Sequence, residues 1–307
     1  MQFQQDNEKR TVTWGLAIIV TLFALFSFFA SQFRNPAFLG DNYESIVEKK
    51  RVLAEMRVQL HKSVEMEKNA VMAPTDEQSR TFADQSRRAS AAVEQNLNQL
   101  RTLIDTVPLQ AEKRLVTEFG HCWTEFVALD QTILDFALQG SNIRATALST
   151  EKGSQLLKHF EQALAGLKSL DAGTAGPSQE TLLADRALIA ALKLYTLHSP
   201  HIAAVSDDKM DALETQMKAE EKEAEQALKK LAGMAGPERQ EAVLQAETAF
   251  ADFVEITATI LRLSRQNSNI KSLELSLGKK RMITAQCDDI LAAFQEVMQS
   301  KTFKATR

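Results

Sequence analysis

The sequence contains few of the residues that interrupt helices. It has 11 Gly and 6 Pro among 307 residues, and only 2 Tyr, one of the residues that favour strands. Ala, Leu, Glu, Gln and Lys, which favour helices, are abundant. We therefore expect an all-α fold, and the length allows two hydrophobic cores or one elongated core.

Motifs for catalysis, metals and cofactors are missing as well. The 5 His form no H-E-x-x-H motif, and Pro200 between His198 and His201 argues against a helical metal pair. There is no C-x-x-C-H haem motif, glycine-rich phosphate loop or nucleophile elbow. We expect no enzymatic activity, no metal and no cofactor. The net charge of −4 gives no basic footprint, so we expect no nucleic-acid partner.

Charge is absent from residues 11–33, which are mostly apolar. A run of about 20 apolar residues is long enough to span a membrane as a helix. Trp14 and Arg34 suit its two interfaces, and the basic residues just before the run place residues 1–10 in the cytoplasm. A cleaved signal peptide is the alternative, but no small-x-small cleavage site follows. The sequence therefore predicts a single-pass anchor in the inner (plasma) membrane, with the bulk of the chain periplasmic or extracytoplasmic.

A long segment of the chain occurs twice. Residues 123–153 align without a gap to residues 250–280, with identity at 12 of 31 positions, which indicates a tandem duplication. The shared apolar positions are spaced by 3, 4, 3 and 7 residues, as in a helical seam that faces partner helices in a bundle. In the first copy these positions are Phe126, Leu129, Ile133, Phe136 and Ile143.

Proline and glycine divide the rest of the chain into two sets of similar layout. Each set has two shorter helices followed by a long one, over residues 41–172 and 177–300, with a tail at residues 301–307. An amphipathic helix must bury its stripe against neighbours, so we expect long antiparallel helices in two tandem or stacked four-helix bundles. Three glycines are placed to break or kink the first long helix, and the sequence does not decide whether they do: Gly120, Gly140 and Gly153.

The two cysteines are Cys122 and Cys287, and they are not equivalent under the repeat. Two such residues define neither a disulfide framework nor a zinc site. We favour two free buried thiols. The alternative is a single disulfide between the repeats, because the predicted compartment is oxidising.

The second copy resembles a known family. The segment L-R-L-S-R-Q-N-S-N-I-K-S-L-E-L-S-L-G-K-K-R, from Leu261, resembles the last helix of the four-helix-bundle sensor domain of methyl-accepting chemotaxis receptors. With the apolar segment and the helical pattern, the resemblance covers about residues 12–300. It implies a sensor in chemotactic signal transduction that acts as a homodimer or through a signalling partner. The family's second membrane helix and cytoplasmic signalling rod are not found in this sequence.

Polar residues interrupt the helical seam at the same place in both copies. The candidate ligand-binding residues are Asn142 and Arg144 in the first copy, and Asn269 and Lys271 in the second. A cation beside an amide can hold a small carboxylate, such as an organic acid or an amino acid. In the alternative interpretation the amides fix helix register and the cations reach solvent.

Two functions follow. The first is a membrane-anchored sensor or ligand-binding protein that signals through a partner or a dimer. The alternative is a non-catalytic structural rod of the cell envelope that binds protein partners. A ligand that stabilises the fold would distinguish the first from the second.

Overall fold

A computed structural model describes residues 36–106, 109–169 and 178–305. Within these ranges every regular element is a helix, so the predicted all-α class is confirmed. The elements are α2 (Pro36–Met72), α3 (Asp76–Thr106), α4 (Gln110–Gln139), α5 (Ser141–Leu148), the π-helix η1 (Ser149–Gly153), α6 (Ser154–Ser169), α7 (Gln179–Thr196), α8 (His198–Ile202), α9 (Asp207–Met234), α10 (Gln240–Gln266), α11 (Ser268–Leu275), the π-helix η2 (Ser276–Lys280) and α12 (Arg281–Ala305).

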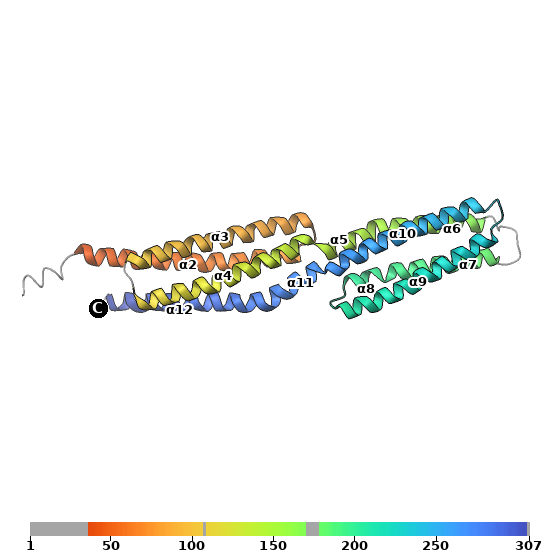
Figure 1. Ribbon diagram of the computed structural model, residues 1–307. Coiled ribbons are helices and arrows are strands. Elements are labelled where there is room, and N and C mark those ends of the chain that lie inside the picture. The colour runs from red at the N-terminus through yellow and green to blue at the C-terminus, as the bar shows by residue number, and fades with distance from the viewer. Residues whose placement is uncertain (1–35, 107–108, 170–177, 306–307) are drawn as a thin grey trace, which may run out of the picture.

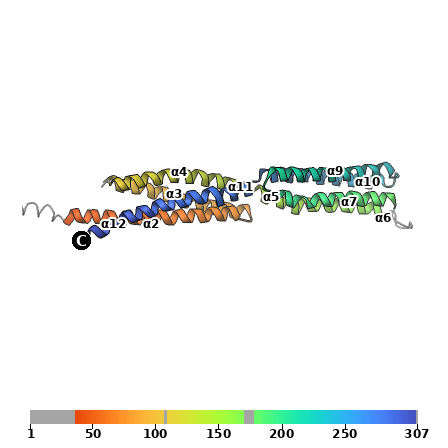
Figure 2. The ribbon, with the colours of Figure 1, turned by 90° about the horizontal axis from the view of Figure 1, so that it is seen from below.

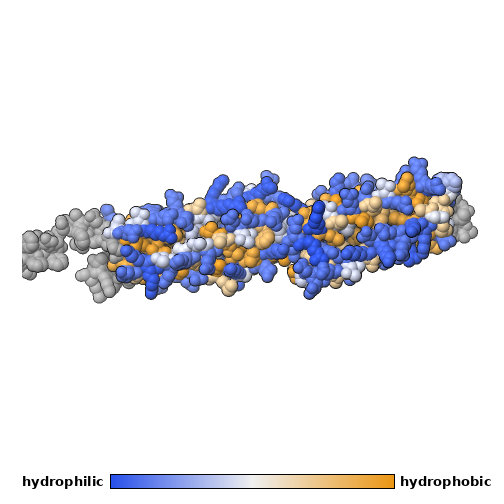
Figure 3. All heavy atoms as spheres, viewed as in Figure 1, coloured by the Kyte–Doolittle hydropathy of each residue, from blue (hydrophilic) through white to orange (hydrophobic). Residues whose placement is uncertain are grey.

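The helices form two bundles that are stacked end to end in a rod (Figures 1 and 2). The first bundle consists of α2, α3, α4 and α12, and its core includes Leu53, Leu97, Phe119 and Phe294. The second bundle consists of α6, α7, α9 and α10, and its core includes Phe160, Leu194, Leu228 and Phe253. On the face shown in Figure 3, short apolar patches alternate with hydrophilic residues along both bundles.

Two long helical segments run through both bundles and connect them. One is α4–α5–η1–α6 and the other is α10–α11–η2–α12, and each holds one copy of the repeat. Consequently α12 packs on α2 and α4, whereas α6 packs on α10. The two bundles therefore do not coincide with the predicted segments 41–172 and 177–300. The physical reason is that neither long segment folds back on itself. Each segment therefore buries one part of its apolar stripe in the first bundle and the other part in the second bundle.

The ends of the described chain lie together at one end of the rod. The first turn of α2 and the last turn of α12 are neighbours there (Figure 1). The helix α12 continues to Ala305, so most of the predicted tail at residues 301–307 is helical. None of the described helices is long and apolar enough to cross a membrane. The predicted anchor at residues 11–33 and the segment 1–10 lie outside the described residues.

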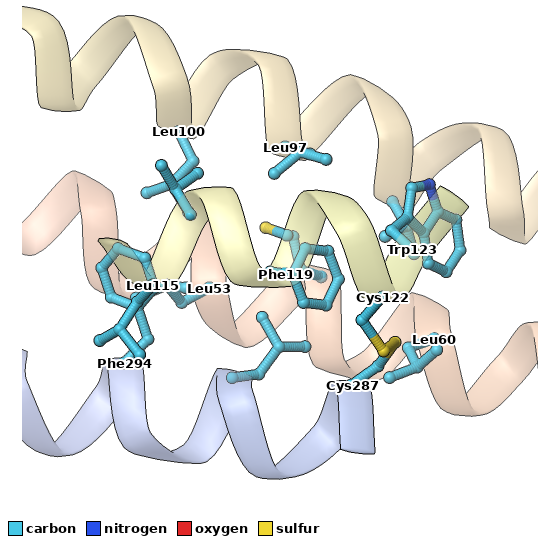
Figure 4. Packing of buried hydrophobic residues seen from close by; sticks show 14 of the residues in the cluster. Leu53, Leu60, Leu97, Leu100, Leu115, Phe119, Cys122, Trp123, Cys287 and Phe294 are labelled. Carbon is cyan, nitrogen blue, oxygen red and sulfur yellow. A yellow bond between two sulfur atoms is a disulfide. The ribbon is translucent and has the colours of Figure 1, made fainter. Parts of the chain in front are cut away.

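The cysteines form a disulfide inside the first bundle. Cys122 on α4 and Cys287 on α12 are bonded, with their Cα atoms 5.8 Å apart (Figure 4). The favoured prediction of two free thiols is therefore wrong, and the alternative of one disulfide between the repeats is correct. The two residues meet because α4 and α12, which come from different copies, pack against each other in the first bundle.

Candidate functional site

Both long segments are interrupted at equivalent residues where the two bundles meet. Gly140 has φ 56° and ψ 29°, and Asn267 has φ 55° and ψ 32°. They are the only residues with positive φ in the described ranges. Glycine adopts this left-handed conformation freely, and asparagine tolerates it better than most residues do. Each break ends one helix and starts the next, so α5 and α11 begin side by side.

The two helix starts cap each other through reciprocal hydrogen bonds. The backbone N–H of Ser141 donates to Ser268 Oγ at 3.0 Å, and the N–H of Ser268 donates to Ser141 Oγ at 3.1 Å. The N–H of Asn142 donates to Asn269 Oδ1 at 3.1 Å, and the N–H of Asn269 donates to Asn142 Oδ1 at 3.3 Å. The first N–H groups of a helix have no partner within that helix. The duplication supplies these partners, and the junction has a local two-fold symmetry.

Asn142 is the most connected residue of this junction. Its Nδ2 donates to the carbonyl oxygen of Ile202 at 2.8 Å and to Asn267 Oδ1 at 3.0 Å. All of its side-chain polar atoms are thus bonded to the chain itself, and the residue is buried. Asn142 therefore joins α5 to α8 and to the break before α11.

The predicted ligand-binding cations turn away from the paired amides. Arg144 bonds to Asp76 Oδ2 at 2.9 Å, in the first turn of α3. Lys271 donates to the carbonyl oxygen of Gln266 at 3.0 Å. The structure thus brings Asn142 and Asn269 together, whereas the two exposed cations bond to other groups. These contacts favour the register-fixing interpretation, and the ligand role of the four residues stays a prediction.

We expect Asn142→Ala to lower the free energy of unfolding by about 2–3 kcal/mol, because it leaves buried polar partners unsatisfied. Asn269→Ala is the matched control, since its side chain accepts only one hydrogen bond across the junction and is partly exposed. Asn269→Ala should lower the free energy of unfolding by only about 1 kcal/mol. Urea unfolding followed by circular dichroism measures both. Equal losses would show that the additional contacts of Asn142 contribute nothing.

A buried ion pair, which the sequence did not reveal, lies next to η2 in the first bundle. Lys280 is 1% exposed, and its Nζ lies 2.6 Å from Asp130 Oδ1 on α4. The same Nζ donates to the carbonyl oxygen of Phe126 at 3.3 Å and lies 3.2 Å from the centre of the Phe126 ring. Glu67 on α2 is a second buried carboxylate near this pair, at 0% exposure.

Burial shifts the pKa of Glu67, Asp130 and Lys280 in the direction that favours the neutral form of each side chain. It raises the pKa of Glu67 to about 7, against smaller opposing effects of the Ser276 hydroxyl and the Lys280 charge. It also raises the pKa of Asp130 and lowers that of Lys280, although the two attract each other. In this ion pair the mutual attraction of Asp130 and Lys280 therefore opposes the effect of burial, which disfavours both charges.

The second bundle has a polar contact at the equivalent place, next to η1. His198 is buried, with Nδ1 3.0 Å from Ser149 Oγ and Nε2 3.1 Å from Thr257 Oγ1. Its ring stacks on Phe253 at 6.0 Å. Burial lowers the pKa of His198 to about 4, which favours the neutral ring. The residues around Lys280 in the first bundle correspond across the repeat to residues around His198 in the second. The pairs are Phe126 with Phe253, Asp130 with Thr257, Ser276 with Ser149, and Lys280 with Gly153.

His198 and His201 do not converge on a metal site. His201 bonds through Nδ1 to Ser264 Oγ at 2.8 Å and through Nε2 to Glu214 Oε1 at 3.1 Å. The described residues contain no cluster of His, Cys, Asp and Glu that would hold a metal ion. Both histidines therefore act as buried hydrogen-bonding groups between helices.

A groove of about 390 Å³ lies between α3 and α4 on the first bundle. Trp123 is 2% exposed and lines this groove, and its indole nitrogen has no hydrogen-bond partner among the described residues. Figure 4 shows this nitrogen on the side of the ring toward α3. The other lining residues include Arg87, Ser90, Glu94, Val127 and Gln131.

The second bundle has an equivalent groove between α9 and α10, of about 460 Å³. Phe250 and Val254 line it, at the positions that correspond to Trp123 and Val127. The helical pattern of the sequence predicted neither groove. The alignment of the copies contained a signal, because one shared position holds an indole with an N–H donor in Trp123 and a phenyl ring without one in Phe250.

Comparisons of this chain with protein-family models, with curated proteins and with solved structures found no match.

Proposed function

We propose that this chain is an extracytoplasmic sensor of the chemoreceptor type, anchored in the inner (plasma) membrane by residues 11–33. It binds a small molecule in the α3–α4 groove and signals through a homodimer or a partner protein. The observation that carries the proposal is the buried indole N–H of Trp123, which has no partner in the described part of the chain and lies at this groove.

An unpaired buried N–H favours a ligand that can accept a hydrogen bond. Leaving such a donor unsatisfied costs about 1–3 kcal/mol, which a bound acceptor recovers. The groove volume of about 390 Å³ is in the range of small-molecule sites. At the position that the two grooves share, Trp123 supplies an indole N–H in the first groove, whereas Phe250 supplies no polar group in the second.

The charges of the groove favour a zwitterion. Arg87 is held only loosely, at 3.5 Å from Asp84 and 3.7 Å from Asp135, and remains 45% exposed. Its guanidinium can therefore turn to a ligand carboxylate. Glu94 is exposed on the same groove and suits a ligand amine. An amino acid matches both, whereas a simple organic acid matches only the donors.

The architecture offers a route from this groove to the membrane. The α4 helix, which carries Trp123, is tied to α12 by the disulfide and packs on α2. The chain enters α2 directly after residues 11–33, at the end of the rod where α12 also ends. A shift of α4 on ligand binding is thus passed to α2 as a small helix translation or rotation.

The test uses the two tryptophans of the chain, Trp14 and Trp123. In a Trp14→Phe variant, the fluorescence reports on Trp123 alone. We expect a saturable change in fluorescence with one or more amino acids at millimolar concentration, and weaker changes with dicarboxylic acids. Arg87→Ala should weaken binding by about tenfold or more, which corresponds to ~1.4 kcal/mol.

Lys229→Ala is the matched control, because Lys229 lines the equivalent groove of the second bundle. It should leave the response of Trp123 unchanged. Trp123→Phe, followed by thermal unfolding, tests the indole N–H directly and should reduce the stabilisation by ligand. If no amino acid or organic acid changes either the fluorescence or the melting temperature, the ligand site is wrong and the structural rod becomes the better function.

A further inference from the structure

Glu67 carries an unusual carboxylate in the core of the first bundle. The residue is 0% exposed, and neither Oε1 nor Oε2 meets the distance and angle of a hydrogen bond with a described residue, although the Ser276 hydroxyl is close enough to act on the carboxylate. An ionised carboxylate without partners is among the costliest groups to bury in a protein. A neutral, protonated carboxyl removes most of that cost.

The charged and titratable groups around Glu67 do not neutralise it. Lys68 follows it on α2, Asp130 faces it from α4, and Lys280 faces it from η2. The Nζ of Lys280 is engaged by Asp130 at 2.6 Å. Arg87 on α3 acts on Asp130. Lys68 is only partly buried and Arg87 is exposed, so among the buried groups of this cluster two carboxylates share one ammonium.

We propose that Glu67 is a proton-binding site, which takes up one proton from solvent in the neutral pH range and so couples the packing of the first bundle around this residue to the pH of the solvent. The proton adds to the free carboxylate, and no other bond forms or breaks. The protonated carboxyl has no charge and gains an O–H donor next to the Ser276 hydroxyl. The proposal goes beyond the sensor function and does not depend on it, because it needs no ligand in the α3–α4 groove.

The sign of the pH dependence follows from the direction of the shift. The pKa of Glu67 is raised from 4.5 to about 7 on folding. The folded chain therefore binds this proton between pH 4.5 and 7, where the unfolded chain has released it. The stabilisation is fully present below pH 4.5 and is lost as the pH rises through 7. Acid thus tightens the first bundle at this site.

The test compares the full-length chain with Glu67→Gln, an uncharged analogue of the protonated form, in urea unfolding from pH 5 to pH 8. The unfolding equilibrium constant of the original protein should rise, relative to that of the variant, by on the order of 50-fold between these pH values. Glu65→Gln is the matched control, because Glu65 is exposed on the same helix. It should follow the original protein at every pH. If Glu67→Gln and Glu65→Gln show the same pH dependence, the proposal is overturned.

A second measurement does not require the variant to fold well. Infrared spectra of the original protein should show the carbonyl band of a protonated carboxylic acid at pH 6, and this band should disappear toward pH 8.5. In Asp130→Asn the charge of Lys280 is released from its partner and becomes available to Glu67. The band should then disappear at a lower pH, because a nearby cation favours the ionised form. A band that is absent at pH 6 in the original protein, or unmoved in Asp130→Asn, contradicts the proposal.

Discussion

Replacing Lys280 with methionine is expected to lower the free energy of unfolding by about 3–5 kcal/mol at pH 8, because it removes the buried ammonium that lies between two buried carboxylates. Lys280 and Asp130 are 1% and 4% exposed, so water cannot replace the lost partner. The variant also loses the contact of the ammonium with the Phe126 ring at 3.2 Å. Urea unfolding followed by circular dichroism measures the loss.

Two controls separate the ion pair from simple packing. Lys279→Met changes the neighbouring, exposed lysine and should cost less than about 0.5 kcal/mol. The double variant Asp130→Asn with Lys280→Met removes both charges of the pair and should recover a large part of the loss. The loss in Lys280→Met should also be smaller at pH 5 than at pH 8, because burial raises the pKa of both carboxylates and protonation removes the charge that lacks a partner. A loss that is equal at pH 5 and pH 8 would mean that packing, and not charge, explains it.

The helical nature of the chain and its repeat could be read from the sequence, because both depend on local patterns. Scarce glycine and proline predicted an all-α fold, and the seam of Phe126 and Ile133 predicted buried faces; both residues are 0% exposed. The same patterns do not say which helices share a bundle. An apolar stripe specifies burial against some neighbour but not which one, and α12 buries its stripe against α2 and α4 of the first bundle.

Local sequence patterns also could not predict the cysteine pairing or the buried ion pair, because both depend on how the helices are assembled. Cys122 and Cys287 become neighbours only after α12 crosses into the first bundle. Lys280 follows another lysine in a polar stretch, so its sequence context indicates an exposed residue. It is buried because η2 widens the helix at this point and turns the position inward. Such a change of helical phase is invisible to a pattern with a fixed period.

The sequence singled out two residues of the junction, Asn142 and Asn269, and offered two roles for them, ligand binding and the fixing of helix register. Asn142 and Asn269 stood out because both copies interrupt an apolar seam with the same polar residues. The sequence alone could not show that equivalent residues of the two copies would bond to each other, at 3.1 and 3.3 Å, across a local two-fold axis. Arg144 is directed to Asp76 by the packing of α3, which is again a property of the assembled bundle.

Reducing the disulfide is expected to destabilise the protein by about 3–5 kcal/mol, which should lower the melting temperature by about 10 °C. Cys122 and Cys287 are separated by 165 residues, and the whole second bundle lies in the loop between them. Removing the bond of so long a loop gives the unfolded chain much additional conformational entropy. The bond also ties α4, the helix that bears Trp123, to α12, so its loss should increase hydrogen exchange in both helices.

The matched control for this prediction is the variant in which both cysteines are replaced by alanine, treated with the same reductant. Its melting temperature should equal that of the reduced original protein to within a few degrees, since each alanine leaves only a small cavity. The reductant should not change it further. Because the bonded residues lie in the first bundle, hydrogen exchange should rise in α4 and α12 before it rises in α7 and α9. Identical melting temperatures of the original protein with and without reductant would show that the bond adds no stability. A rise in hydrogen exchange confined to the second bundle would show that the first bundle does not open first, contrary to the position of the bond.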